Sequence, residues 1–121
     1  ELHVPVDENA ASAYVRRRNP LSGYATVGVA ARLWVDDGTV TKARVAATGA
    51  PPHPVRLPGV EAALAGSDVG DDAAERAAER AMDDLSVADL NGDVEASSEF
   101  RAHLLELFTE RAVAAAMDRA R

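Results

Sequence analysis

The chain has 121 residues with 13 Lys and Arg against 20 Asp and Glu, a formal net charge of −7, and no cysteine. This length fits one domain with one modest core. Without cysteine the chain cannot form disulfides, thiolate metal sites or iron–sulfur ligation of its own. The acidic balance argues against nucleic-acid binding, which needs a basic face. No apolar run approaches the ~20 residues of a membrane span. We find no signal-peptide pattern and expect a cytoplasmic location.

The first 48 residues predict an edge segment followed by a β-hairpin. Residues 1–13 are typical of an incoming linker or edge strand, because Pro5 is poorly placed in a central strand. Residues 24–35 alternate apolar side chains at period two, which predicts a strand. The Asp-Asp-Gly-Thr run at 36–39 favours a tight turn. Residues 40–48 then return as a second strand, with Lys42 and Arg44 on one face.

The remaining residues predict a short strand and three helices. The proline-rich run 49–54 is typical of extended backbone, and 55–57 predicts a brief strand. Pro58 opens a helix to about residue 65, stopped by Gly66. A second helix is expected over 71–85, and the longest over 97–119, capped by Ser97. Its expected apolar stripe is Phe100, Leu104, Leu107, Phe108 and Ala115. Strands followed by helices indicate an α+β fold, with a small antiparallel sheet of three to four strands packed against about three helices.

The run from Tyr14 to Gly28 joins a cationic cluster, an Asn-Pro turn and an apolar strand. It resembles the entry to the C-terminal domain of the FAD-binding (medium) subunit of molybdenum hydroxylases, the carbon monoxide dehydrogenase and xanthine dehydrogenase family. The family form is roughly Tyr-x-Lys-x-x-Asn-Pro-Ala-Ser-x-Tyr-Ala, then a strand with a central Gly. Arg16 replaces the usual Lys, and Leu21 replaces Ala. The matching residues are Tyr14, Asn19, Pro20, Ser22, Tyr24, Ala25 and Gly28.

Two further segments resemble the same family in the same order. One runs through residues 43–46, 49–51, 54–56 and 61–66. The other is an Asp-Val-x-x-Ser-x-x-Tyr-Arg pattern, which reads here from Asp93 to Arg101 with Phe100 in place of Tyr. Each segment alone is a weak signal. Three of them in the family's order, over roughly residues 12–112, argue against a chance match.

The resemblance implies that residues 14–121 form this C-terminal domain and that residues 1–13 lead in from an FAD-binding region. In the family, glycine-rich loops upstream hold FAD, which passes electrons between iron–sulfur clusters and a final acceptor. The iron–sulfur and molybdenum cofactors belong to partner subunits. This chain has no Gly-x-Gly-x-x-Gly loop to cradle phosphates. We therefore expect the isolated domain to be inactive and not to bind FAD tightly, with no membrane or nucleic-acid partner.

Two residues carry the expected cofactor contact. Arg16 holds the position of the family's Lys near the flavin ring, where a fixed cation favours reduction. Because a guanidinium is planar and longer than an ammonium group, its hydrogen-bond geometry at the flavin would differ from that of Lys. Alternatively, Arg16 is a solvated or interfacial arginine. Tyr14 either packs beside the flavin ring system or is a buried aromatic residue that anchors the first loop. We assign no catalytic residue and no metal ligand.

Other chemistry-bearing residues have structural explanations. Arg56 and Arg101 match family positions, but ion pairs with Glu61, Glu99 or other carboxylates account for them. Phe100 and Trp34 are expected to contribute packing. His3, His53 and His103 are too scattered to indicate a metal triad.

Two functions follow from the sequence. The first is the C-terminal domain of a flavin subunit in a molybdenum-hydroxylase-type oxidoreductase, helping to close the flavin site and to assemble with iron–sulfur and molybdenum subunits. The alternative is a stand-alone, non-enzymatic protein-interaction module of the same fold.

Overall fold

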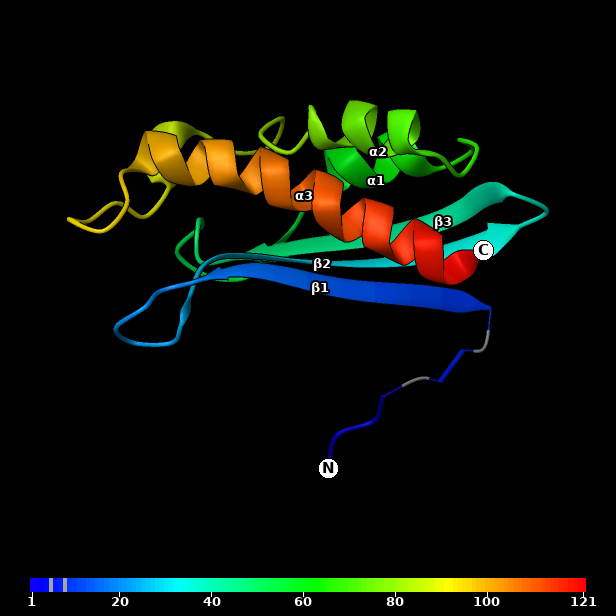
Figure 1. Ribbon diagram of the computed structural model, residues 1–121, viewed down its shortest axis with the longest axis horizontal. Coiled ribbons are helices and arrows are strands. Elements are labelled where there is room, and N and C mark those ends of the chain that lie inside the picture. The colour runs from blue at the N-terminus through cyan, green and yellow to red at the C-terminus, as the bar shows by residue number, and fades with distance from the viewer. Residues whose placement is uncertain (5, 8) are drawn as a thin grey trace.

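The computed structural model describes residues 1–4, 6–7 and 9–121, and Pro5, which favoured an edge position, lies outside them. A four-stranded antiparallel sheet in the order β1-β2-β3-β4 carries its helices on one face (Figure 1). This confirms the expected α+β fold. The strands are β1 (Ala10–Arg18), β2 (Ala25–Asp36), β3 (Thr39–Thr48) and β4 (Val55–Arg56). The helices are α1 (Pro58–Leu64), α2 (Asp71–Ala78), the 3-10 helix η1 (Val87–Asp89) and α3 (Ser98–Ala120).

The β2–β3 hairpin forms where the sequence predicts it. Val27, Val29 and Leu33 are fully buried, because alternate residues of β2 face the core. Asp37 and Gly38 make the turn with φ of 51° and 76°. Two successive positive φ angles suit the right-handed twist of the flanking strands.

Strand β1 lies at the edge of the sheet and pairs with β2 along its whole length, from Ala10 opposite Trp34 to Arg18 opposite Ala25. It begins inside the segment 1–13, which the sequence assigns to a linker or edge strand. The arginine cluster at 16–18 is therefore the end of a strand. Because a strand alternates its faces, Arg16 and Tyr14 point to the same side.

The helices α1 and α3 confirm their predicted positions. Pro58 opens α1, and the Ser97 hydroxyl caps α3 by accepting a hydrogen bond from the Phe100 N–H at 3.1 Å. Phe100 itself is partly buried against the core. The apolar stripe of α3 is only partly as predicted, since Leu107 and Ala115 are half-buried. The residues that are fully buried or nearly so include Leu104, Leu105, Phe108, Ala112, Val113, Ala116 and Met117.

The helix expected over 71–85 is wrong in length, because α2 ends at Ala78. Beyond it the chain continues in tight turns, such as Ala81 N–H to Ala78 O at 3.0 Å. These turns bury Ala81 and bring the Asp84 carboxylate to the Gly59 N–H at 3.2 Å, at the start of α1. Tertiary fit against α1 therefore ends the helix, although the local sequence favours its continuation.

The core lies between the sheet and the helical layer. Alanine fills much of it, from Ala13, Ala31 and Ala43 in the strands to Ala74 and Ala77 in α2. Small side chains let the layers approach closely but bury little area each. Among the residues that the structure describes, no helix lies over the opposite face of the sheet (Figure 1). The predicted cofactor residues lie on that face.

Candidate functional site

The open face of the sheet is built from alternate residues of β1, β2 and β3, together with β4. The residues that alternate with them along the strands, such as Ala13, Ala31 and Val45, point to the other face of the sheet and are buried beneath the helices. Strand register arranges the open-face residues in rows across the sheet. One row is Arg16, Gly28 and Thr48; the next is Tyr14, Ala30, Ala46 and Arg56; a third is Ser12, Arg32 and Arg44.

Arg16 projects from the end of β1 and is exposed. Its Nη1 donates to the Gly23 carbonyl oxygen at 3.3 Å, so the guanidinium lies against the β1–β2 loop. That loop is held by Asn19, whose side-chain oxygen accepts from the Leu21 N–H at 2.9 Å. The Asn19 turn predicted from the sequence is thus confirmed. The loop gives Arg16 a supported, solvent-facing position.

Tyr14 is 52% exposed, so its interpretation as a buried aromatic anchor is wrong. No helix in the described part of the chain covers Tyr14 on the open face. The Tyr14 ring instead lies over Gly28: a Cβ added at Gly28 would come within 2.4 Å of the Tyr14 hydroxyl oxygen. The missing side chain at Gly28 makes room for the ring. Tyr14 is therefore a half-exposed aromatic side chain on the open face, with its hydroxyl over Gly28.

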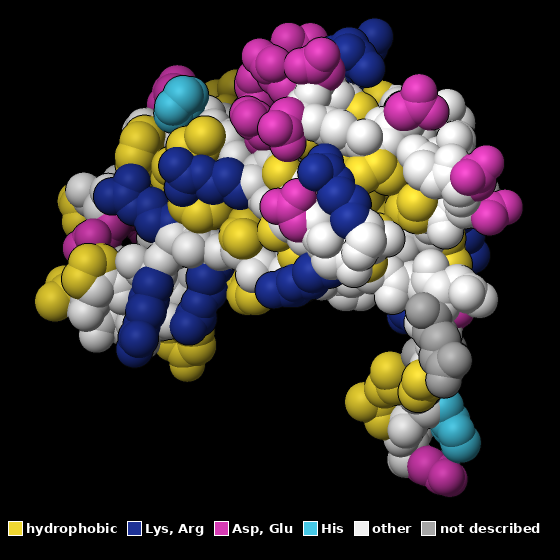
Figure 2. Space-filling model, turned by 45° about the vertical axis from the view of Figure 1, so that its right-hand side comes forward, with side chains coloured by type: hydrophobic (Ala, Val, Ile, Leu, Met, Phe, Trp, Pro, Cys, Tyr) yellow, Lys and Arg dark blue, Asp and Glu magenta, His cyan; other side chains and the backbone are white. Residues whose placement is uncertain are grey.

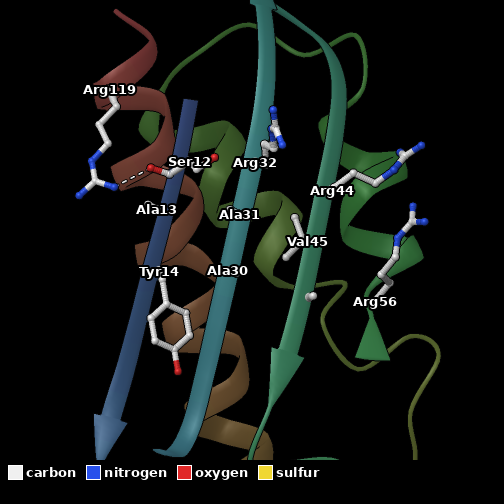
Figure 3. A pocket seen from close by; sticks show the side chains of 11 residues that line it. Ser12, Ala13, Tyr14, Ala30, Ala31, Arg32, Arg44, Val45, Arg56 and Arg119 are labelled. Atoms are coloured by element: carbon white, nitrogen blue, oxygen red, sulfur yellow. Dashed lines mark hydrogen bonds between the residues drawn. The ribbon is translucent and has the colours of Figure 1, made fainter. Parts of the chain in front are cut away.

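A hollow of about 510 Å³ runs along this face between β1 and β4 (Figure 3). Its floor includes Ala30, Ala46 and Tyr14, and its cations are Arg32, Arg44, Arg56 and Arg119. Arg119 reaches round from α3 and donates to the Ser12 carbonyl oxygen at 2.5 Å. The sequence analysis missed this hollow as a unit. The face shared by Lys42 and Arg44 was its one visible signal.

Arg56 has the ion pair that the sequence suggested. Its guanidinium donates from Nε and Nη2 to the two carboxylate oxygens of Glu61, at 2.9 and 2.7 Å. Glu61 is buried and also accepts from the Val45 N–H at 3.0 Å. Burial is the largest influence and raises the pKa of Glu61. The hydrogen bonds from Arg56 and Val45, with the charges of Arg56 and Arg44, outweigh it and leave the pKa below its ordinary value. The pair joins β4, β3 and α1.

Arg101 also has a structural role, but its ion-pair partner is Asp93 rather than Glu99. The guanidinium is buried and donates to Asp93 at 3.2 Å and to the Thr26 carbonyl oxygen at 2.8 Å. Hydrogen bonds from the Ala96 and Glu95 N–H groups and the charge of Arg101 overcome a smaller effect of burial, and hold the pKa of Asp93 below its ordinary value. Arg101 therefore fixes the end of the sheet from which the Arg16 loop projects.

Within residues 1–4, 6–7 and 9–121, no three His, Cys, Asp or Glu side chains converge as a metal site would require. None of the helices described combines the length and apolar character of a membrane span.

The fold and the exposed motif together define a small α+β domain whose sheet is covered on one side only. The family profile of the CO dehydrogenase flavoprotein C-terminal domain matches residues 12–116, and the chain belongs to this family. The resemblance found in the sequence is thereby confirmed. No curated protein sequence matches the chain.

Solved structures show the same fold. Carbon monoxide dehydrogenase from Hydrogenophaga pseudoflava, in a form lacking the Mo-pyranopterin moiety, is 25% identical over 94% of this chain, with a TM-score of 0.84. Quinoline 2-oxidoreductase from Pseudomonas putida 86 is 23% identical over 97%, with a TM-score of 0.85. Reconstituted CO dehydrogenase from Oligotropha carboxidovorans is 21% identical over 94%, with a TM-score of 0.82. The match spans 39%, 40% and 39% of those chains, about two-fifths of their length.

Proposed function

We propose that this chain is the C-terminal domain of the FAD-binding subunit of a molybdenum-hydroxylase-type oxidoreductase. It helps to close the flavin site and assembles with iron–sulfur and molybdenum subunits during electron transfer. The observation that carries the proposal is the family match over residues 12–116. The exposed Tyr14 and Arg16 in the family's opening motif support it. A cytoplasmic location is part of the same proposal.

The side chains at the end of the open face suit a flavin edge. FAD, when bound, would supply two-electron chemistry and gather negative charge around N1 and its neighbouring carbonyl on reduction. Arg16 would present a fixed positive charge there, since within the described residues it forms no ion pair. Tyr14 would offer its ring as a packing surface and its hydroxyl as a donor. Neither residue binds phosphate, a task that falls to the upstream region.

The test is the Arg16→Ala substitution in the full-length flavin subunit. Loss of the cation should weaken flavin binding or lower the flavin midpoint potential, and Arg16→Lys should restore part of either effect. Arg111→Ala, which removes an exposed cation of α3, serves as the matched control. An Arg16→Ala subunit with unchanged flavin affinity and potential would contradict the assigned contact.

A second measurement separates the two functions considered. The 121-residue domain alone should show no tight binding in a flavin titration, because it contributes only one side of the site. A full-length subunit that binds FAD supports the enzyme role. A natural protein that starts near Glu1 and binds no flavin would support the interaction module.

A further inference from the structure

Like charges face one another on the open sheet. Arg32 of β2 lies directly opposite Arg44 of β3, and Lys42 lies opposite Trp34. The Arg32 guanidinium carbon and Lys42 Nζ lie 5.1 and 4.6 Å from the centre of the Trp34 ring. Like charges in directly opposed positions destabilise a sheet. In addition, the buried Arg32 Nε has no hydrogen-bond partner within the part of the chain described. Two carboxylates lie beside this cluster: Glu61, 4.0 Å from Arg44 Nη1 but already paired with Arg56, and Asp7, which accepts from Trp34 Nε1. The three cations still outnumber these two carboxylates.

The centre of the same face is small and apolar. Positions of a sheet that face water normally carry polar side chains, yet Ala30 and Ala46 occupy the middle of this one, and Gly28 beside them lies under the Tyr14 ring. Tyr14, Trp34 and arginines surround them. An apolar centre with a charged rim, rich in Tyr, Trp and Arg, is the composition of a protein–protein interface. The small residues would let the backbone of a partner approach the sheet closely.

Charge is segregated between the two sides of the molecule. The open face carries Arg16, Arg32, Lys42, Arg44 and Arg56. Acidic side chains gather on the helical side, which is uppermost in Figure 2. They include Asp71, Asp72, Glu75, Glu79, Asp83 and Asp84, all exposed. A cationic face on a chain of net charge −7 selects an acidic partner.

We propose that the open sheet face docks an acidic surface of the FAD-binding region of the same subunit, whose carboxylates accept hydrogen bonds from Arg32, Arg44 and Lys42. This inference rests on the proposed function. The chain enters β1 from this side: Asp7 accepts a hydrogen bond from Trp34 Nε1 at 2.5 Å on the open face. The N-terminus also lies on the side away from the helices (Figure 1). Covalent tethering on that side gives the preceding region a high effective concentration there.

Lys42 makes the surface directly testable, since it is the single lysine of the chain and is exposed. A carbodiimide activates a carboxylate, and the Lys42 amine then displaces the resulting urea to leave an amide bond. In the full-length subunit, mass spectrometry should find Lys42 joined to an Asp or Glu of the FAD-binding region. Acetylation of Lys42 should be at least tenfold slower than in the isolated domain. In the control variant Arg111→Lys, the new amine on the helical side should be acetylated equally fast in the full-length subunit and in the isolated domain.

Charge reversal tests the role of the arginines. Arg32→Glu combined with Arg44→Glu should raise Lys42 acetylation in the full-length subunit to the rate of the isolated domain. Arg76→Glu combined with Arg111→Glu makes the same change in net charge on exposed helical positions and should leave Lys42 protected. Circular dichroism of each double variant as an isolated domain checks that it folds.

Failure of this inference is distinguishable from failure of the proposed function. A subunit that binds FAD while Lys42 reacts as fast as in the isolated domain overturns the docking surface alone. A subunit that binds no FAD overturns the proposed function. Cross-links from Lys42 to a separate subunit overturn the choice of partner. Protection of Lys42 in the isolated domain by inorganic pyrophosphate would identify a small-anion site instead.

Discussion

Arg101 on the first turn of α3 donates from Nη1 to the carbonyl oxygen of Thr26, 75 residues earlier, at 2.8 Å. The same nitrogen lies 3.2 Å from the Gly49 carbonyl oxygen, and Nε lies 3.4 Å from that of Ala96. One buried guanidinium thus joins the start of β2, the end of β3 and the loop before α3. The five N–H donors of a guanidinium, held in a rigid planar fork, suit this arrangement of carbonyl groups.

The Arg101→Ala variant should lose about 3–5 kcal/mol of unfolding free energy, because it leaves several buried carbonyl groups without donors. The unfolding free energy of Arg101→Lys should lie between those of Arg101→Ala and the wild type, since one ammonium group reaches fewer of these carbonyl groups. Urea denaturation followed by circular dichroism measures both. Arg76→Ala, at an exposed position of α2, should change stability by less than about 0.5 kcal/mol. If Arg101→Ala had the same urea midpoint as the wild type, the stabilising role of Arg101 would be contradicted.

Gly49 should tolerate alanine far less than Gly38 does. Both have positive φ, 84° and 76°. A Cβ at Gly49 would lie 2.5 Å from the Thr26 carbonyl oxygen, whereas a Cβ at Gly38 meets nothing within 4 Å. Gly38→Ala should therefore cost about 1–2 kcal/mol, the penalty of the left-handed backbone alone. Gly49→Ala should cost at least ~3 kcal/mol, because backbone must also move. Equal losses in thermal unfolding would show that steric contact plays no part.

Elements with strong local signals could be predicted from the sequence. The alternating apolar residues of β2, the Asp37-Gly38 turn, Pro58 at the start of α1 and the Ser97 cap of α3 each act within a few residues. The length of α2 could not be predicted in this way, because its end depends on the fit of the following turns against Gly59. A boundary set by tertiary contact leaves no local pattern.

The candidate site likewise has features that the sequence predicts and features that only the fold reveals. Lys42 with Arg44 was recognisable as a polar face, whereas no strand was expected at residues 14–18, so the shared strand face of Tyr14 and Arg16 was not predicted. That Arg32 lies opposite Arg44 depends on the pairing register of two strands. The partner of Arg101 depends on three distant segments meeting. Sequence patterns therefore indicate which residues share a face, and the fold decides which of them meet.

Glu61 should contribute to loss of stability in acid. Its pKa is lowered in the folded protein from an ordinary 4.5. Below that value the unfolded chain takes up a proton that the folded protein resists, so stability falls with pH. The contribution is fully present above about pH 4.5 and is lost as pH falls through the folded pKa. Urea denaturation at several values between pH 7 and pH 3 measures the slope.

Glu61→Gln isolates this contribution, since the amide oxygen still accepts from the Val45 N–H. The variant should be less stable by about 1–2 kcal/mol at pH 7, where the charge-assisted bonds to Arg56 are lost. Its disadvantage should shrink toward pH 3. The lowered pKa values of Asp7 and Asp93 leave a residual acid slope in both proteins. Parallel curves for wild type and variant would exclude Glu61 as an acid-sensitive group.

Trp34 should report the protonation of Asp7. It is the one tryptophan of the chain, and its Nε1 donates to the Asp7 carboxylate. This hydrogen bond is the largest influence that lowers the pKa of Asp7 from 3.8, followed by the Asn9 N–H. Protonation weakens the bond, so Trp34 emission should change with a midpoint below pH 3.8, while Asp7→Asn should show no such step.

Far-ultraviolet circular dichroism over the same range separates this local change from acid unfolding. If the emission step precedes the loss of helical signal and disappears in Asp7→Asn, the segment before β1 is held on the open face by this one carboxylate. Release of that segment should also raise quenching of Trp34 by acrylamide. An emission step that persists in Asp7→Asn would assign the titration to another group, and the entry of the chain across the open face would lose its main support.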